Sequence, residues 1–178
     1  AEGHQRKYTD EIRKIGLKLS MDISVKDKPV ANNEDAQKIA NEISTEKPDG
    51  ILLVMFYNGS LPQVNLVLEA ADKLNIPSVF YIGLGVKHGP IRNYMEKSGV
   101  YFIQSLDNFE AIESGLNMIN VRKLLKQSVL LSIDQTEGRN ETVEPFLGIT
   151  TRPLLVDTYN KELNSIRTGK ETADLISR

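Results

Sequence analysis

The stretch that decides the fold is Asp49-Gly-Ile-Leu-Leu-Val-Met-Phe-Tyr-Asn-Gly-Ser-Leu-Pro-Gln-Val-Asn-Leu-Val-Leu-Glu-Ala-Ala-Asp-Lys-Leu-Asn75. Residues 51–57 form an unbroken apolar run of strand length, which is typical of a central strand buried on both faces of a parallel sheet. Asn58 and Gly59 then favour a turn, and Ser60 is placed to cap a helix with Pro62 in its first turn. The apolar residues that follow at helical spacing are Val64, Val67, Leu68, Ala71 and Leu74.

A second strand is expected at 78–82, so this stretch predicts one strand–helix–strand unit of a doubly wound α/β sheet. The same alternation continues in both directions. Further helices are expected at 5–15 (ending at Gly16), from Asn32 or Asn33, at about 90–97, from Asp107 as cap to about 126, and from about Tyr159. Further strands are expected at 17–25, 100–103, 128–133 and 149–156, with one helical turn at 141–146. Pro153 favours an edge or a break in the last strand.

These elements predict two domains. Residues 1–126 are expected to form a Rossmann-like (flavodoxin-like) doubly wound parallel sheet whose first strand is missing. Residues 127–178 are expected to begin a second α/β domain, or to be the last elements of the same domain. Because the chain starts on a helix and leaves its second sheet incomplete, we expect a fragment of a longer protein; a complete small sheet is the alternative.

Composition limits the classes of function. The formal net charge is −2 with the two signs mixed along the chain, which gives no electrostatic reason to expect nucleic acid or a membrane surface as partner. The absence of Cys excludes disulfides and thiolate chemistry, and it favours a cytoplasmic location without excluding the periplasm. No apolar run approaches the roughly 20 residues of a membrane helix.

Two loops are candidate binding sites, because ligands of open parallel sheets bind beyond the carboxyl ends of the strands. The first loop offers Tyr57, Asn58 and Ser60, whose amide and hydroxyl groups suit sugar hydroxyls; a simple capped turn is the alternative. The second is a glycine-rich loop, 83–92. Its candidate ligand contacts are Lys87, His88 and Arg92, which favour an anion or a polar substrate. A nucleotide is the alternative there, and so is a loop without a ligand. No catalytic or metal-binding residues are predicted.

The order of segments resembles the N-terminal domain of the L-fucose/L-arabinose isomerase-like sugar isomerases. Four stretches carry the likeness: Lys47-Pro-Asp-Gly-Ile-Leu-Leu-Val-Met-Phe, Leu74-Asn-Ile-Pro-Ser-Val-Phe-Tyr, Leu106-Asp-Asn-Phe-Glu-Ala-Ile-Glu-Ser-Gly-Leu, and 129–156 with Leu147-Gly148 before its strand. The resemblance implies an oligomeric parent that interconverts aldoses and ketoses with a divalent metal, usually Mn²⁺. It places the metal ligands in later domains, so no cofactor is expected in this chain.

The resemblance therefore predicts a domain that contributes to sugar recognition and to assembly of a homo-oligomer, while isomerisation takes place elsewhere in the parent. Two alternatives remain open. The chain would otherwise be one lobe of a sugar-binding or sugar-sensing protein of the periplasmic type, or a nucleotide- or flavin-binding domain that uses the loop at 83–89.

Overall fold

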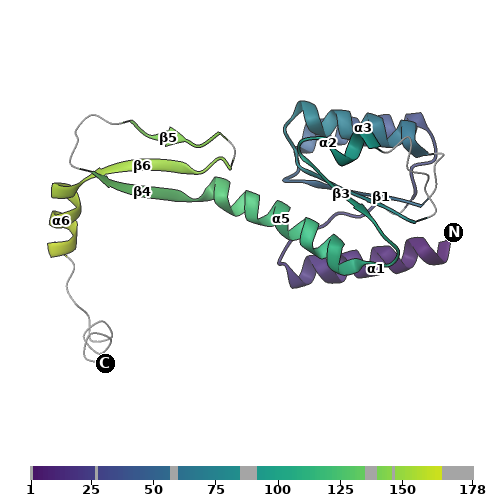
Figure 1. Cartoon of the computed structure of the whole chain (residues 1–178), viewed down its shortest axis with the longest axis horizontal. Coiled ribbons are helices and arrows are strands. Elements are labelled where there is room, and N and C mark those ends of the chain that lie inside the picture. The colour runs from purple at the N-terminus through teal and green to yellow at the C-terminus, as the bar shows by residue number, and fades with distance from the viewer. Residues whose placement is uncertain are drawn as a thin grey trace, which may run out of the picture. The chain divides into compact units, whose positions relative to one another are not determined.

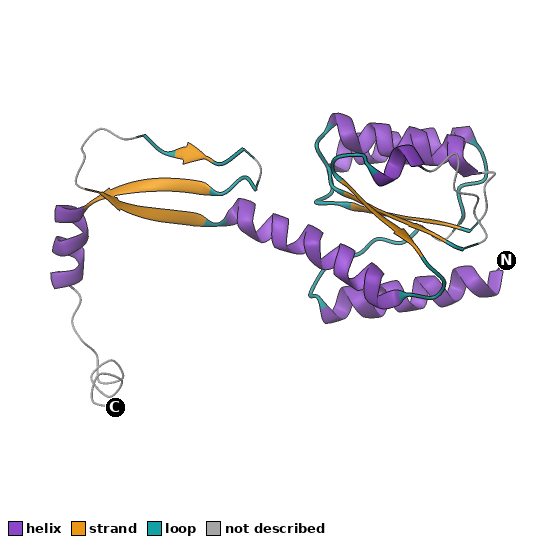
Figure 2. Cartoon of the chain, viewed as in Figure 1, coloured by secondary structure: helices purple, strands orange, loops and turns teal. Residues whose placement is uncertain are grey.

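The computed structural model describes residues 2–26, 28–56, 60–84, 92–134, 140–145 and 147–165. The chain divides into two compact units, residues 1–123 and 124–178. Each unit contains a β-sheet and helical segments (Figures 1 and 2). The predicted α/β class is therefore confirmed.

The first unit is built on a three-stranded parallel sheet of order β1-β2-β3. Its elements are α1 (Glu2–Lys18), α2 (Asn33–Glu46), β1 (Ile51–Met55), α3 (Leu61–Lys73), β2 (Ser78–Ile82), α4 (Arg92–Met95), β3 (Val100–Gln104) and most of α5 (Phe109–Gln127). The middle strand is β2, and all five of its residues are buried. The prediction that 51–57 forms the central strand is wrong, because β1 lies at one edge of the described sheet and is only partly buried.

Helices cover both faces of this sheet (Figure 1). On one face, α1 and α5 pack against β2 and β3 through a cluster that consists of Tyr8, Ile12, Ile15, Val79, Tyr81, Ile103, Ile112, Leu116 and Ile119. On the other face, α3 and α4 cover the sheet through Val64, Leu68 and Tyr94, and α2 packs against α3 through Ala36, Ile43 and Val67. The apolar spacing thus predicted the buried sides of α1, α2 and α3, but Leu74 after α3 and Leu124 in α5, which were expected in the apolar stripes, are exposed.

Residues 17–25 differ from the expected strand. Helix α1 continues past Gly16 to Lys18, and residues 21–26 have no regular secondary structure. The alternation that suggested a strand is nevertheless real: Leu19, Met21, Ile23 and Val25 are half-buried against the α1/α5 cluster, and the residues between them are exposed. An extended segment with one buried side produces this alternation whether or not its backbone forms hydrogen bonds with a neighbouring strand.

The helix starts agree with expectation at one of three places. The Asn32 side chain caps α2 by accepting a hydrogen bond from the backbone N–H of Asp35 at 2.9 Å. Ser60 precedes α3 but makes no side-chain cap bond, so its predicted capping role is wrong. At α5 the cap is Asn108 rather than Asp107, because the Asn108 Oδ1 accepts from the N–H of Ala111 at 3.0 Å.

The second unit contains the end of α5 with β4 (Val129–Asp134), β5 (Thr142–Val143), β6 (Thr150–Leu155) and α6 (Val156–Ser165). Its sheet has the order β4-β6-β5, with β4 parallel and β5 antiparallel to β6. The prediction of a helical turn at 141–146 is wrong for the described residues of this range, because Thr142 and Val143 form the strand β5. Every buried hydrophobic residue of the described chain lies at or before Ile119, so the described part of this unit has no buried apolar core.

Pro153 lies in the middle strand of this sheet, where we expected an edge or a break. The N–H of Thr150 donates to the carbonyl of Ser128 on the β4 side. Backbone groups alternate along a strand, so the nitrogen of Pro153 faces the opposite side, toward β5. The short β5 pairs only with Thr150 and Thr151. Pro153 therefore removes no ladder hydrogen bond, because its nitrogen lies beyond the end of β5.

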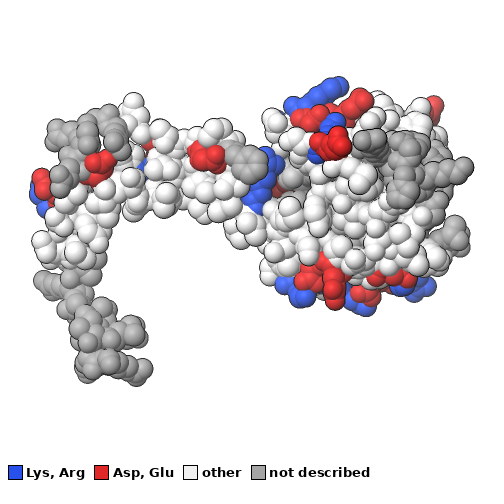
Figure 3. Space-filling view, viewed as in Figure 1, with Lys and Arg blue, Asp and Glu red and all other residues white. Residues whose placement is uncertain are grey.

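Charges on the first unit are mixed and paired rather than gathered by sign (Figure 3). Ion pairs with N–O distances of 2.5–3.1 Å join Lys7 to Asp107, Lys18 to Glu113, Lys26 to Glu42, Lys97 to Asp72 and Lys123 to Asp49. All of these ion pairs are substantially exposed, so each adds little to stability.

A helix with the length and apolar character needed to cross a bilayer is not found in the described part of the chain.

Candidate functional site

The carboxyl edge of the first sheet is where the candidate site is built. β1 and β2 are neighbours that end together, with Met55 opposite Ile82. Helix α3 starts at this edge because it follows β1. Helix α2 runs into β1 through a short turn, so its first residues return to the same edge. Two helix N-termini therefore meet beyond the strand ends, which is the usual place for a ligand in open α/β sheets.

The predicted site residues fall mostly outside the described residues. This holds for Tyr57, Asn58, Lys87 and His88. Ser60 is half-buried at the start of α3, and Arg92 is the first residue of α4, although its side chain is not described. Both loops follow strands that are neighbours in the sheet, as the sequence predicted. The contribution of these six residues to binding remains a prediction.

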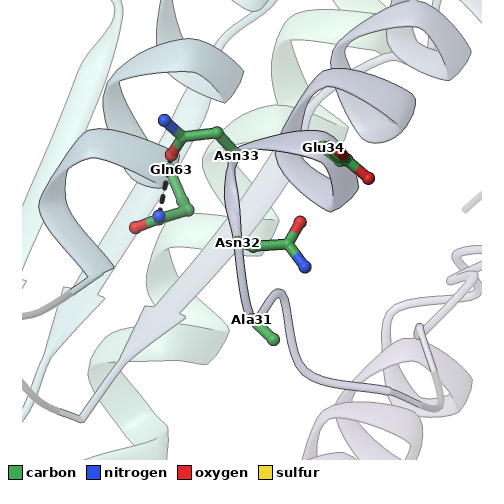
Figure 4. A pocket seen from close by; sticks show the side chains of 5 residues that line it. All are labelled: Ala31, Asn32, Asn33, Glu34 and Gln63. Atoms are coloured by element: carbon green, nitrogen blue, oxygen red, sulfur yellow. Dashed lines mark hydrogen bonds between the residues drawn. The ribbon is translucent and has the colours of Figure 1, made fainter.

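A solvent-open hollow of about 560 Å³ lies at the N-termini of α2 and α3. Its lining residues are Ala31, Asn32, Asn33, Glu34 and Gln63. Figure 4 shows the side chains of Asn33 and Gln63 reaching toward one another from the two helices. We call these two side chains the amide pair.

The amide pair leaves one strong hydrogen-bonding group unused. Gln63 Nε2 donates to Asn33 Oδ1 at 2.8 Å, which fixes the orientation of both amides. Gln63 Oε1 is buried and accepts no hydrogen bond from any residue that the structure describes. A buried acceptor without a donor costs about 1–3 kcal/mol. A hydroxyl or amide donor that reached this oxygen would recover that free energy.

The charge of the hollow favours a neutral ligand. Among the lining residues that the structure describes, Glu34 alone carries a formal charge, and none is a Lys or Arg that would attract a phosphate or carboxylate. The partial positive charge at the start of α2 offsets part of the Glu34 charge. Asn and Gln amides offer both donors and acceptors, which matches the two-way hydrogen bonding of hydroxyl groups. The arrangement suits a small polyhydroxylated molecule better than an anion.

A second polar cluster lies at the same edge on the α1/α5 face. Tyr8 Oη donates to Tyr81 Oη at 3.1 Å, and Tyr81 Oη donates to the carbonyl of Ser105 at 2.9 Å. In return, the Tyr8 oxygen accepts from the N–H of Asp107 at 3.2 Å, and the Tyr81 oxygen accepts from the N–H of Asn108 at 3.4 Å. Both rings are buried. The pair thereby fixes the turn that follows β3 and leads into α5.

This tyrosine pair is structural rather than ligand-binding. Each hydroxyl proton already has an acceptor, so neither can be donated to a ligand without breaking the network. Burial, with the Tyr81 hydrogen bond as the next cause, raises the pKa of Tyr8 above its ordinary value, and the phenol stays protonated at neutral pH. Nearby, the Lys7 ammonium bonds the Asp107 carboxylate at 2.6 Å and lowers the pKa of that carboxyl.

The described residues contain no group of three or more His, Cys, Asp or Glu side chains that would hold a metal ion. Comparison with known proteins finds no family model, no curated protein and no solved structure that matches the chain. The site has to be interpreted from its own geometry.

Sequence reasoning missed the amide pair. Asn33 and Gln63 are 30 positions apart, and each is unremarkable in its own helix. A local signal did exist, because amide side chains occur in the first turns of two helices that end up at the carboxyl edge. Recognising the pair from sequence would have required knowing that α2 and α3 lie side by side.

Proposed function

We propose that this chain is the N-terminal part of a sugar isomerase-like protein. In this proposal the first unit is a Rossmann-like domain that binds a small neutral sugar at its carboxyl edge, and the chain takes part in assembling a homo-oligomer. The aldose–ketose conversion and its metal ligands belong to parts of the protein beyond this chain.

The observation that carries the proposal is the amide pair with its unused acceptor. A sugar presents several adjacent hydroxyl groups, each able to donate and to accept. One hydroxyl would donate to Gln63 Oε1 after the Gln63 side chain turns this buried oxygen toward the hollow, and the exposed Asn33 amide would donate to a neighbouring oxygen. The loops after β1 and β2, which carry Tyr57, Asn58, Lys87 and His88, follow the strand ends at the same edge and would add further contacts.

The test is a binding experiment on the whole chain. A panel of aldoses and ketoses, including L-fucose and L-arabinose, is titrated while the melting temperature is followed, and any hit is quantified by calorimetry. A sugar at a hundredfold excess over its Kd stabilises the folded state by about 2.7 kcal/mol. We expect a rise of several degrees for one sugar class and at least a tenfold loss of affinity in Gln63→Ala, because the variant lacks the unpaired acceptor.

The matched control is Gln37→Ala. Gln37 Nε2 donates to Asn41 Oδ1 at 3.1 Å on the exposed surface of α2, so this variant breaks the same kind of amide bond away from the hollow. It should bind sugar as the unaltered chain does. Sugar binding that survives Gln63→Ala would contradict the role of the amide pair. Stabilisation by NAD, NADP or FMN and by no sugar would contradict the proposal and favour the nucleotide-binding alternative.

A further inference from the structure

The open edge of β4 is the most unusual surface of the second unit. β4 pairs with β6 on one side, and no described strand pairs with its other side. Its apolar residues Val129, Leu130, Leu131 and Ile133 are 47–59% exposed. Figure 3 shows that the face of this unit in view is largely uncharged. An edge strand of this kind is a template for pairing with another chain.

The β4 strand itself lacks most of the protective residues that edge strands usually carry. Monomeric proteins shield edge strands with Lys, Pro, bulges or very short length. β4 is six residues long, has no Lys, Arg, Pro or Gly, and pairs with β6 residue by residue without a bulge. The described protection is limited to Asp134 at the end of β4 and to the contacts of α6 with β4, although a strand rich in Val, Leu and Ile needs protection most. An unprotected edge is expected where pairing is part of the working state.

The sequence of β4 is self-complementary about Leu131. Because the carbonyl of Ser128 faces β6, alternation turns the backbone groups of Val129, Leu131 and Ile133 toward the open edge. Two antiparallel copies related by a two-fold axis at Leu131 place Leu131 opposite Leu131 and each Val129 opposite Ile133 of the other copy. All three pairs are apolar, lie on one face, and exchange two hydrogen bonds each.

Other registers are poorer. An axis at Ser132 places Leu130 opposite Asp134 and Ser132 opposite itself, and an axis at Leu130 leaves Ile133 without an apolar partner. We propose that β4 is the dimerisation edge of this chain, and that two copies join their second sheets through antiparallel β4 strands centred on Leu131. The inference rests on the assembly role proposed above and specifies its surface, but it does not depend on sugar binding.

The test exploits the absence of Cys from the sequence. Paired residues that exchange hydrogen bonds have Cα atoms about 5.5 Å apart, which is within the range for a disulfide. Leu131→Cys introduces a single thiol at the axis. Leu163→Cys is the matched control, because Leu163 lies on α6 and has nearly the same exposure, 51% against 55%. Under mild oxidation of the full chain, Leu131→Cys should form a covalent dimer at least tenfold faster than the control.

Sedimentation of the Cys-free chain supplies the second measurement. We expect a reversible dimer that Leu131→Lys weakens at least tenfold and Leu163→Lys leaves unchanged. A chain that remains monomeric at about 100 μM would overturn both the edge and the assembly role, while any sugar binding would stand. A dimer in which the two Cys variants cross-link equally slowly would overturn β4 as the dimerisation edge, while the assembly role would stand. Faster cross-linking of Ser132→Cys would overturn the register.

Discussion

Replacing Tyr8 by Phe removes one hydroxyl group and leaves the ring contacts of α1 in place. The ring packs edge-on against Phe56 and at a tilt against Phe109, with centroid separations of 4.9 Å in both cases. What disappears is the hydrogen bond to Tyr81 and the acceptor for the Asp107 N–H. The substitution therefore isolates the polar part of the tyrosine pair from its packing.

The expected loss follows from the groups that are left behind. A buried group that loses its hydrogen-bond partner costs about 1–3 kcal/mol. Tyr81 keeps its own acceptor at Ser105, and the exposed Asp107 allows water to approach its N–H, so the lower half of that range applies. We predict a destabilisation of about 1–2 kcal/mol. This corresponds to a fall in melting temperature of roughly 4–8 °C for a unit of this size.

The assay is urea unfolding followed by far-ultraviolet circular dichroism, with the slope against urea checked for constancy. Tyr101→Phe is the control, because Tyr101 is 38% exposed on β3 and its hydroxyl is not part of the network. That control should change the free energy of unfolding by less than about 0.5 kcal/mol. If Tyr8→Phe is as mild as Tyr101→Phe, the tyrosine pair does not stabilise the fold and our account of it is wrong.

Three further predictions concern the same unit. Gly115→Ala should destabilise the first unit by about 1–3 kcal/mol in urea unfolding, because the added Cβ would lie 2.9 Å from both Val79 methyl groups. An unchanged or higher free energy of unfolding would show that the core has room for this methyl group. Gly3→Ala, with open space around the site, should be neutral or slightly stabilising. In NMR titration the Asp107 carboxyl should show a lowered pKa that rises toward its ordinary value in Lys7→Gln, because the hydrogen bond from Lys7 is the largest cause of the lowering. Because the pKa of Asp107 is lower in the folded state, the stability from this ion pair is present above the pKa of the unfolded state and is lost as the pH falls through the pKa of the folded state. An Asp107 pKa that is the same in Lys7→Gln as in the unaltered chain would contradict the ion pair.

The parts of the fold that sequence predicted are those that depend on a residue and its near neighbours. Helix α1 buries Tyr8, Ile12 and Ile15 as their spacing indicated, and Asn32 caps α2 as its position indicated. Prediction from neighbouring residues fails when a side chain binds a residue that is distant in the sequence. Asp107 was expected to cap α5, but its carboxylate is held by Lys7, which is 100 positions away, and the neighbouring Asn108 takes the capping role.

Strand order and site geometry were not predictable for the same reason. The apolar run at 51–57 indicates burial, but burial by helices on two faces does not say which strands lie beside it. β1 is partly covered on both faces and still lies at the edge of the described sheet. The amide pair likewise exists only because α2 and α3 pack together, and no spacing within either helix encodes the contact between Asn33 and Gln63.

The placement of Pro153 has a consequence for how far such an assembly can grow. On the β5 side of the second sheet, the short β5 pairs only with Thr150 and Thr151, and the proline nitrogen beyond it offers no hydrogen to an incoming strand. Among the described strands, sheet extension is therefore favoured through the six-residue β4 over the two-residue β5. Once two copies have joined there, each has used the more receptive of the two edges of its described second sheet. The association is expected to be finite and closed, so that higher concentration yields more pairs rather than fibres.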